Sequence, residues 1–195
     1  MGSSRLVIGG ARSGKSEFAE GLLAAAHGRK GYIATSRIGD AEMRERVRTH
    51  RARRPEEWIT FELPTSEMDA LGDILDKADV FLFDCVTMYV NNLLLDEWGD
   101  LGSDVSVVFS EREIEKITDR LRHEMDTLQT IINRSSAEVI FVTNELGMGI
   151  VPNNAMSRLY RDLVGLANQR LGDISSKVDL VMAGILVRLK RGEHE

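Results

Sequence analysis

The stretch Gly9-Gly10-Ala11-Arg12-Ser13-Gly14-Lys15-Ser16 decides the fold of this 195-residue chain. It matches the pattern G-x-x-x-x-G-K-[ST], and it lies between a short apolar run at residues 5–8 and an amphipathic helical pattern at residues 16–26. Its glycines let the backbone turn and direct N–H groups towards phosphate oxygens, and the helix that follows adds the positive end of its dipole. The stretch therefore predicts a loop that binds the phosphates of a nucleotide.

Two side chains of this loop have specific expected contacts. Lys15 is expected to reach the β and γ phosphates of a nucleoside triphosphate, and Ser16 a magnesium ion. An acidic residue is expected as a second magnesium ligand, and Asp84 is the first candidate because it ends an apolar run whose carboxyl end should face the ligand. Asp84 is equally well interpreted as the N-cap of the next helix. Glu145 is a second candidate for the metal.

Apolar runs and helical patterns alternate along the whole chain. The predicted strands are residues 5–8, 31–35, 80–84, 139–143 and 178–183. The predicted helices are residues 16–26, 41–53, 87–95, 111–133 and 155–171. This alternation is typical of βαβ units and predicts an α/β fold of the P-loop NTPase type, with a mostly parallel, doubly wound sheet flanked by helices.

Three further features complete the predicted fold. Residues 185–189 are expected to form an antiparallel strand at the edge of the sheet, and residues 96–110 a long loop. In the predicted helix 111–133 the apolar residues that recur at helical spacing are Ile114, Ile117, Leu121, Leu128 and Ile131 or Ile132. The length of the chain predicts one domain, residues 1–195.

Composition excludes several classes of protein. The chain has 25 Lys and Arg against 31 Asp and Glu, a net charge of −6, which argues against a general nucleic-acid coat or a membrane-surface protein. No run approaches the roughly 18 apolar residues of a membrane span. The single cysteine, Cys85, excludes an internal disulfide framework and a Cys-rich zinc site, and it favours the cytoplasm.

A positive cluster surrounds one histidine. Its arginines are Arg44, Arg46, Arg48, Arg51, Arg53 and Arg54, and His50 lies among them. For an arbitrary charge run the favoured interpretation is a solvated helix face, but in a nucleotide enzyme a bank of arginines for polyphosphate is at least as well supported. Neighbouring cations disfavour the imidazolium form of His50, so a neutral ring is available to attack phosphorus. The alternative is an ordinary surface histidine.

The chain resembles, almost from end to end, the bifunctional adenosylcobinamide kinase / adenosylcobinamide-phosphate guanylyltransferase family of cobalamin biosynthesis. The matching segments are GGARSGKS (9–16), YIATS (32–36), RVRTHRARRP (46–55), DCVTMYVNNLL (84–94), TNELGMGIVP (143–152) and RLYRDLVGLANQRL (158–171). Several motifs in the same order make this resemblance far more specific than the phosphate-binding loop alone.

The resemblance implies two reactions. A nucleoside triphosphate, GTP or ATP, phosphorylates the aminopropanol hydroxyl of adenosylcobinamide, and GMP is then transferred from GTP onto that phosphate. His50 falls where the family carries its guanylylated histidine, and the family assembles as a homotrimer. Nucleotide contacts outside the loop are implied for Ala34, Thr35, Ser36, Arg51, Ala52, Arg53, Arg54, Glu62 and Asp84. Asp84 stands where some relatives carry Glu.

Two other functions are alternatives to this one. A plain P-loop kinase for a small molecule would carry out one reaction, and His50 would then have no chemical role. A GTP-binding regulatory module would need the guanine-reading pattern N-K-x-D, but none of the six lysines follows an asparagine. A covalent nucleotide adduct distinguishes the bifunctional enzyme from the plain kinase.

Overall fold

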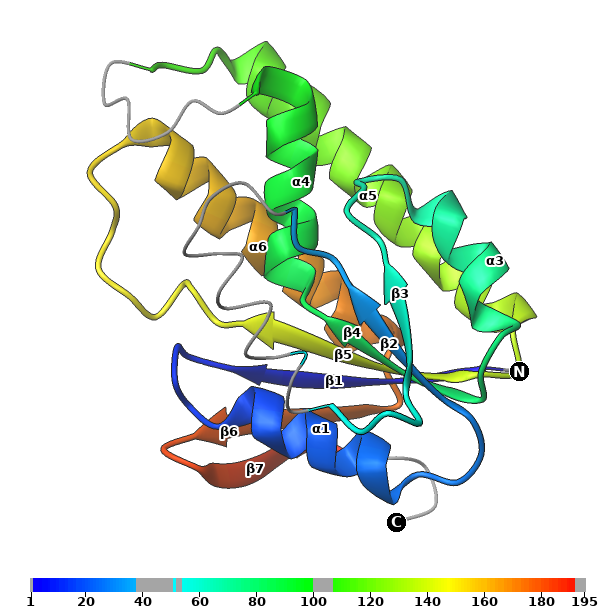
Figure 1. The fold of residues 1–195 in the computed structure, drawn as a ribbon. Coiled ribbons are helices and arrows are strands. Elements are labelled where there is room, and N and C mark those ends of the chain that lie inside the picture. The colour runs from blue at the N-terminus through cyan, green and yellow to red at the C-terminus, as the bar shows by residue number, and fades with distance from the viewer. Residues whose placement is uncertain (1, 38–50, 52–53, 100–106, 192–195) are drawn as a thin grey trace.

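The structure, a computed structural model, describes residues 2–37, 51, 54–99 and 107–191. Its centre is a seven-stranded sheet in the order β3-β2-β4-β5-β1-β6-β7, in which only the β6–β7 pair is antiparallel (Figure 1). The strands are β1 (Ser3–Gly9), β2 (Lys30–Ala34), β3 (Ile59–Glu62), β4 (Val80–Asp84), β5 (Glu138–Asn144), β6 (Lys177–Met182) and β7 (Ile185–Lys190). The predicted mostly parallel sheet with an antiparallel edge strand is confirmed.

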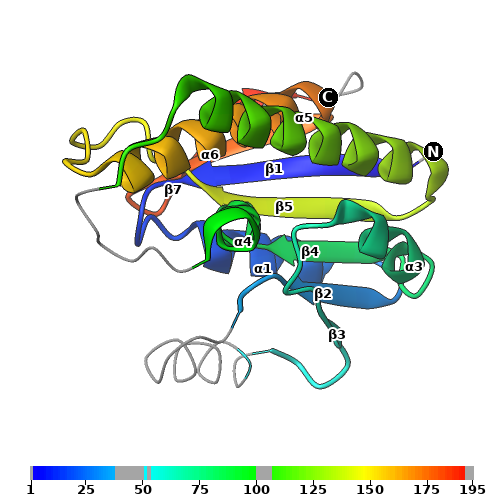
Figure 2. The same cartoon turned by 90° about the horizontal axis from the view of Figure 1, so that it is seen from above.

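Helices cover both faces of this sheet. They are α1 (Lys15–Ala25), η1 (Met68–Leu71), α3 (Gly72–Leu75), α4 (Val86–Trp98), α5 (Glu111–Arg134) and α6 (Ala155–Ile174). Helix α1 lies on one face, and α3, α4, α5 and α6 lie on the other (Figures 1 and 2). The prediction of a doubly wound arrangement is therefore confirmed.

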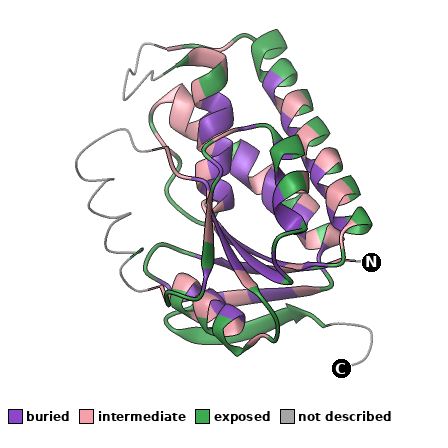
Figure 3. Ribbon diagram, turned by 45° about the vertical axis from the view of Figure 1, so that its right-hand side comes forward, coloured by how far each residue is buried: buried purple, intermediate pink, exposed green. Residues whose placement is uncertain are grey.

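The period of the strands divides the core into two layers. Successive side chains of a strand point to opposite faces, so Phe81 and Phe83 of β4 join the cluster under α4, α5 and α6, while Val80 and Leu82 join the cluster under α1. Figure 3 shows the buried faces of the helices turned towards the sheet. Near-continuous apolar strands are what a sheet covered on both faces requires.

The sequence patterns missed three short elements. Strand β3 has four residues and no fully buried side chain, and η1 and α3 have four residues each. Strand β3 exists because it pairs in parallel with β2, where Ile59 lies opposite Gly31. Such pairing is a tertiary contact, and a four-residue segment carries too little periodicity to predict it.

The long helix α5 follows its predicted bounds, but one predicted core position is wrong. A capping box at Ser110 and Glu113 starts the helix, and Ile114, in its first turn, is 40% exposed. The buried stripe consists of Ile117, Leu121, Met125, Leu128 and Ile132. The last two buried positions are Leu128 and Ile132, four residues apart. Of the two predicted alternatives, Ile131 and Ile132, it is therefore Ile132 that belongs to the buried stripe.

Two predicted segments overlap the part of the chain that is not described. The expected loop 96–110 is wrong at its start, because α4 continues to Trp98. The ring centroid of Trp98 lies 4.7 Å from that of Phe109. Residues 100–106 lie outside the described part of the chain. Of the predicted helix 41–53, only Arg51 is described, and it is helical. No helix in the described ranges is long and apolar enough to cross a bilayer.

Candidate active site

The phosphate-binding loop connects the carboxyl end of β1 to the start of α1. Gly14 is the N-cap of α1 with a φ of 94°, a conformation that strongly favours glycine. The Lys15 ammonium, on the first helical residue, donates to the carbonyl oxygen of Gly10 at 3.1 Å and so bridges the loop. Burial lowers the pKa of Lys15, although the nearby Cys85 and Asp84 oppose this shift. A phosphate that binds here can replace the carbonyl as the partner of the ammonium.

The β6–β7 hairpin packs against this loop. Its two turn residues, Ala183 and Gly184, have φ angles of 53° and 76°, as a type I′ turn requires. The Gly184 N–H donates to the Ser13 carbonyl at 2.9 Å. A Cβ added to Gly9 would lie 2.4 Å from the carbonyl oxygen of Val181. The loop is thus held between β1 and the hairpin.

Replacing Gly9 by alanine is expected to destabilise the enzyme by about 1–3 kcal/mol, because the added methyl overlaps a backbone atom of β6. Gly10→Ala is the matched control, since a Cβ at Gly10 meets nothing within 4 Å. Thermal unfolding should show a lower Tm for Gly9→Ala and an unchanged Tm for Gly10→Ala. An equal Tm for the two variants would contradict the assigned contact.

A cavity of about 460 Å³ opens beside the loop at the carboxyl ends of β2, β4 and β5. The lining residues that the sequence analysis named are Ala11, Arg12, Lys15, Ser16, Ala34, Ser36, Arg54, Glu62 and Asp84. Those that it did not assign to the site are Tyr32, Cys85, Thr87, Met88, Val142, Asn144 and Tyr160. Segments far apart in the sequence therefore meet in one cavity that includes the phosphate-binding lysine.

Asp84 is held at the edge of this cavity by Tyr32. The Tyr32 hydroxyl donates to Oδ2 of Asp84, and the Arg54 guanidinium lies 3.3 Å from the centre of the Tyr32 ring. Burial and the negative charge of Asp84 both raise the pKa of Tyr32, so its hydroxyl remains a donor. Helix α4 begins at Val86 with Cys85 as its N-cap, which shows that the N-cap interpretation of Asp84 is wrong.

The rival carboxylate, Glu145, is engaged elsewhere. Its Oε1 accepts the Gly147 N–H at 2.6 Å, and it is absent from the lining of the cavity. Asp84 and Ser16 both line the cavity and offer a carboxylate and a hydroxyl. This oxygen donor set fits magnesium, which proteins usually bind through one or two carboxylates together with substrate phosphates.

Thr35 does not line the cavity. It is fully buried, its hydroxyl donates to the Cys85 carbonyl at 2.9 Å, and the Cys85 N–H donates back to that hydroxyl at 2.9 Å. Its own carbonyl accepts from the side chain of Asn92 at 2.8 Å. Thr35 thus ties the end of β2 to the start of α4, and only its neighbours Ala34 and Ser36 line the cavity.

The other predicted residues divide into three groups. Gly9, Gly10, Ser13 and Gly14 shape the loop without lining the cavity. Arg51 is exposed. His50, Ala52 and Arg53, together with Arg44, Arg46 and Arg48, lie outside the described residues.

The missed lining residues belong to recognisable places in the chain. Tyr32 begins the YIATS segment, and Asn144 directly follows the predicted buried strand 139–143, at a position where polar side chains face a ligand. Tyr160 donates from its hydroxyl to the Thr87 carbonyl at 3.0 Å and so joins α6 to α4. The position of Asn144 after a strand was a usable signal. Tyr160 belongs to the matching segment 158–171, but no pattern within that segment distinguishes it from its neighbours.

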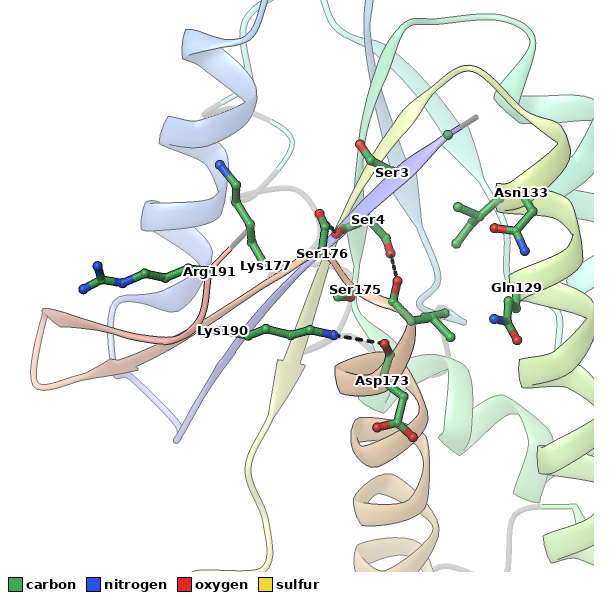
Figure 4. Close-up of a pocket in the computed structure, with 13 residues that line it drawn as sticks. Ser3, Ser4, Gln129, Asn133, Asp173, Ser175, Ser176, Lys177, Lys190 and Arg191 are labelled. Carbon is green, nitrogen blue, oxygen red and sulfur yellow. Dashed lines mark hydrogen bonds between the residues drawn. The ribbon is translucent and has the colours of Figure 1, made fainter. Parts of the chain in front are cut away.

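A second, larger cavity of about 570 Å³ lies at the amino ends of β1 and β6 (Figure 4). Lys190 donates there to the carbonyls of Gly172 and Asp173 at 3.1 Å each. It thereby satisfies carbonyl groups at the C-terminus of α6, where a cation is favourable. This cavity contains no residue of the phosphate-binding loop, so we assign the active site to the smaller one.

Comparisons with known proteins agree with the sequence analysis. The family model described as cobinamide kinase / cobinamide phosphate guanyltransferase matches residues 5–189. The bifunctional adenosylcobalamin biosynthesis protein CobU of Escherichia coli strain K12 is 40% identical over 185 residues, which cover 95% of this chain and 98% of that protein. The corresponding protein CobP of Pseudomonas aeruginosa strain PAO1 is 35% identical, covering 95% of this chain and 96% of that protein.

Solved structures with little sequence identity show the same fold. An ATPase from the type III secretion system of pathogenic bacteria matches with a TM-score of 0.56 at 13% identity, covering 92% of this chain and 51% of that chain. The protein PH0250 of Pyrococcus horikoshii OT3 matches with a TM-score of 0.54 at 7% identity, covering 98% and 88%. At these identities the likeness concerns the fold alone.

Proposed function

The chain belongs to the cobinamide kinase / cobinamide phosphate guanyltransferase family, and from this membership we propose how its single site carries out both reactions. The enzyme phosphorylates cobinamide and then transfers a guanylyl group to cobinamide phosphate. The observation that carries the proposal is the meeting of Lys15, Ser16 and Asp84 in one cavity with Arg54. One domain, residues 1–195, serves both reactions in this proposal.

In the kinase step the adenosylcobinamide hydroxyl attacks the γ-phosphorus of ATP or GTP. The new O–P bond forms as the bond to the β,γ-bridging oxygen breaks, and a nucleoside diphosphate leaves. The loop amides and Lys15 stabilise the charge on the transferred group, which is catalysis by positioning and electrostatics. Ser16 and Asp84 would hold the magnesium ion, which neutralises phosphate charge when bound.

In the transferase step His50 is the proposed nucleophile. A neutral imidazole nitrogen attacks the α-phosphorus of GTP, and pyrophosphate leaves. An oxygen of adenosylcobinamide phosphate then displaces the histidine from the GMP adduct, and adenosylcobinamide-GDP forms. The proposed nucleotide contacts are Arg51, Ala52, Arg53 and Arg54, which follow the histidine, and Ala34, Thr35, Ser36 and Glu62. The side chain and both backbone groups of Thr35 already have protein partners, so it would contribute by positioning Ala34 and Ser36.

Chain geometry supports this role for His50. Only three residues lie between His50 and Arg54 in the sequence. Arg54 itself lines the cavity and stacks on Tyr32. The closeness of His50 to Arg54 in the sequence supports the assignment of the histidine to this site.

Incubation with cobinamide and magnesium, followed by identification of the products by mass, tests the proposed function. With ATP alone we expect cobinamide phosphate, and with GTP cobinamide-GDP and pyrophosphate. A chelator should suppress both reactions. Phosphorylation without guanylylation would favour the plain kinase, and nucleotide binding without any corrinoid product would favour the regulatory module.

We also propose that the enzyme is a homotrimer in the cytoplasm. In a cyclic trimer each subunit contacts its two neighbours through two different surfaces. The described residues include two exposed clusters of apolar side chains that could serve as these surfaces. Ile185, Val187 and Leu189 of the edge strand β7 are 67%, 45% and 60% exposed. Met148, Ile150 and Val151 of the β5–α6 loop are 77%, 96% and 63% exposed. The free thiol of Cys85 suits a reducing compartment.

The trimer is tested by light scattering on the eluting protein. The wild type should have three times the mass of one chain, and Val187→Glu should shift the mass towards that of one chain by placing a charge on β7. Lys116→Glu is a control on the distant helix α5. A wild type with the mass of a single chain would contradict the proposal.

A further inference from the structure

Asn144 occupies a central position in the active site to which no role has been assigned so far. It ends β5 and lies opposite Gly9 of β1 in the parallel register, directly beside the start of the phosphate-binding loop. Its side chain lines the same cavity as Lys15, Ser16 and Asp84. A polar group at this point lies close to the phosphates of any nucleotide bound on the loop.

The carboxamide of Asn144 is bonded at one end only. Its Nδ2 donates to the Thr87 hydroxyl at 3.4 Å. Its Oδ1 is buried and has no hydrogen-bond partner among the described residues. Native proteins leave few buried acceptors without a partner, because the lost hydration is not replaced. Because Asn144 itself lines the active-site cavity, the missing partner of this oxygen is expected to arrive with the substrates.

Neighbouring side chains hold Asn144 in place. The buried Asn168 of α6 donates from Nδ2 to the Asn144 carbonyl at 3.0 Å, and its Oδ1 accepts from the Thr143 hydroxyl at 2.7 Å. On the other side, Tyr160 bonds the backbone of Thr87 at 3.0 Å. These bonds hold the backbone of Asn144 and of Thr87, the residue whose hydroxyl accepts from the Asn144 carboxamide.

The free oxygen requires a hydrogen donor. Ionised phosphate oxygens carry no proton and would be repelled by an amide oxygen. The ribose hydroxyls of the nucleotide lie away from the phosphates, whereas Asn144 lies beside the start of the phosphate-binding loop. Near the phosphates, the kinase step supplies an O–H donor in two ways, as the cobinamide alcohol or as water bound to magnesium. Only the alcohol must be oriented for attack, and only the kinase step uses it, because the acceptor in guanylyl transfer is already a phosphate.

We propose, on the basis of the function proposed above, that Asn144 is a catalytic residue of the kinase step whose Oδ1 accepts a hydrogen bond from the attacking hydroxyl of cobinamide. With the O–H directed at Oδ1, a lone pair of the alcohol oxygen faces the γ-phosphorus. The O–P bond forms, the bond to the β,γ-bridging oxygen breaks, and the proton passes from the alcohol oxygen to the transferred phosphoryl group. Asn144 orients the proton and does not accept it.

The proposal is tested with Asn144→Ala against Asn168→Ala. Asn144→Ala should lower kcat/KM for cobinamide phosphorylation at least about tenfold, the usual range for a lost hydrogen bond to a reacting group. Guanylyl transfer to preformed cobinamide phosphate should fall much less than phosphorylation does, because that reaction has no attacking alcohol. The Tm should be unchanged or higher, because the substitution removes an unpaired buried acceptor. Asn168→Ala, which breaks two formed hydrogen bonds, should lower the Tm and both activities.

Other results would overturn the proposal. Unchanged phosphorylation in Asn144→Ala would do so, as would a lower Tm with both activities reduced together, the pattern of a structural residue. Weaker binding of a magnesium complex of a non-hydrolysable ATP analogue, measured without corrinoid, would assign Oδ1 to metal-bound water and overturn the alcohol contact. Failure of the proposed function itself is distinct, because the wild-type enzyme would then form no corrinoid phosphate.

Discussion

His50→Ala is expected to abolish guanylyl transfer and to leave cobinamide phosphorylation measurable. The two effects separate because the proposed GMP adduct needs the imidazole nitrogen, whereas phosphoryl transfer on the loop needs no protein nucleophile. The control is His123→Ala, an exposed histidine on α5, which should retain both activities. No other substitution is expected to separate the two reactions so completely.

The adduct can be detected directly. Incubation with GTP labelled at the α-phosphate, then denaturation and peptide mapping, should place the label on the peptide that contains His50. A phosphoramidate is expected to be labile in acid and relatively stable in base, because the nitrogen leaves well once it is protonated. Adding cobinamide phosphate should release the label. A wild type without label, or a label that persists in His50→Ala, would show that the mechanism is wrong.

Lys15→Ala is expected to reduce cobinamide phosphorylation by about 10² to 10³-fold, the range seen when one donor to a developing charge is removed. The side chain is almost fully buried at the loop and bonds only the Gly10 carbonyl among the described residues. Because burial already disfavours the charged ammonium, as its lowered pKa indicates, losing it should cost little stability.

Steady-state phosphorylation and thermal unfolding test Lys15→Ala together. The rate should fall while the Tm stays within a few degrees of wild type. Lys116→Ala removes an exposed lysine whose partner is Glu97 on α4, and it should change neither quantity. Unchanged turnover in Lys15→Ala would contradict the assignment of the phosphate-binding loop.

Much of the fold was predictable because its signals are local. Strand β4 has the predicted bounds, and the other predicted strands differ from the structure by at most two residues at either end. Helix α5 and the edge strand β7 were predicted for the same reason, since periodicity and capping residues act within a few residues. Strand β3 was missed because only its pairing with β2 stabilises it.

The site was predictable where one motif contains the chemistry. Lys15 and Ser16 belong to a loop whose geometry follows from its own glycines, so their positions could be inferred without any tertiary contact. The carboxyl end of β4 likewise marked Asp84 as a candidate. The sequence alone left Asp84 and Glu145 as rivals, because strand order does not appear in local patterns.

The sequence by itself determined the alternating elements, the phosphate-binding loop and the resemblance to a family. The tertiary structure decided which side chains share the cavity. The register of β2 and β4 places Ala34 opposite Asp84, which brings the Tyr32 hydroxyl to that carboxylate although 52 residues separate them in the chain. The same packing turns Thr35 into a structural link and leaves Asn144 with an unpaired oxygen. Such contacts depend on where strands and helices pack, and no window of neighbouring residues contains that information.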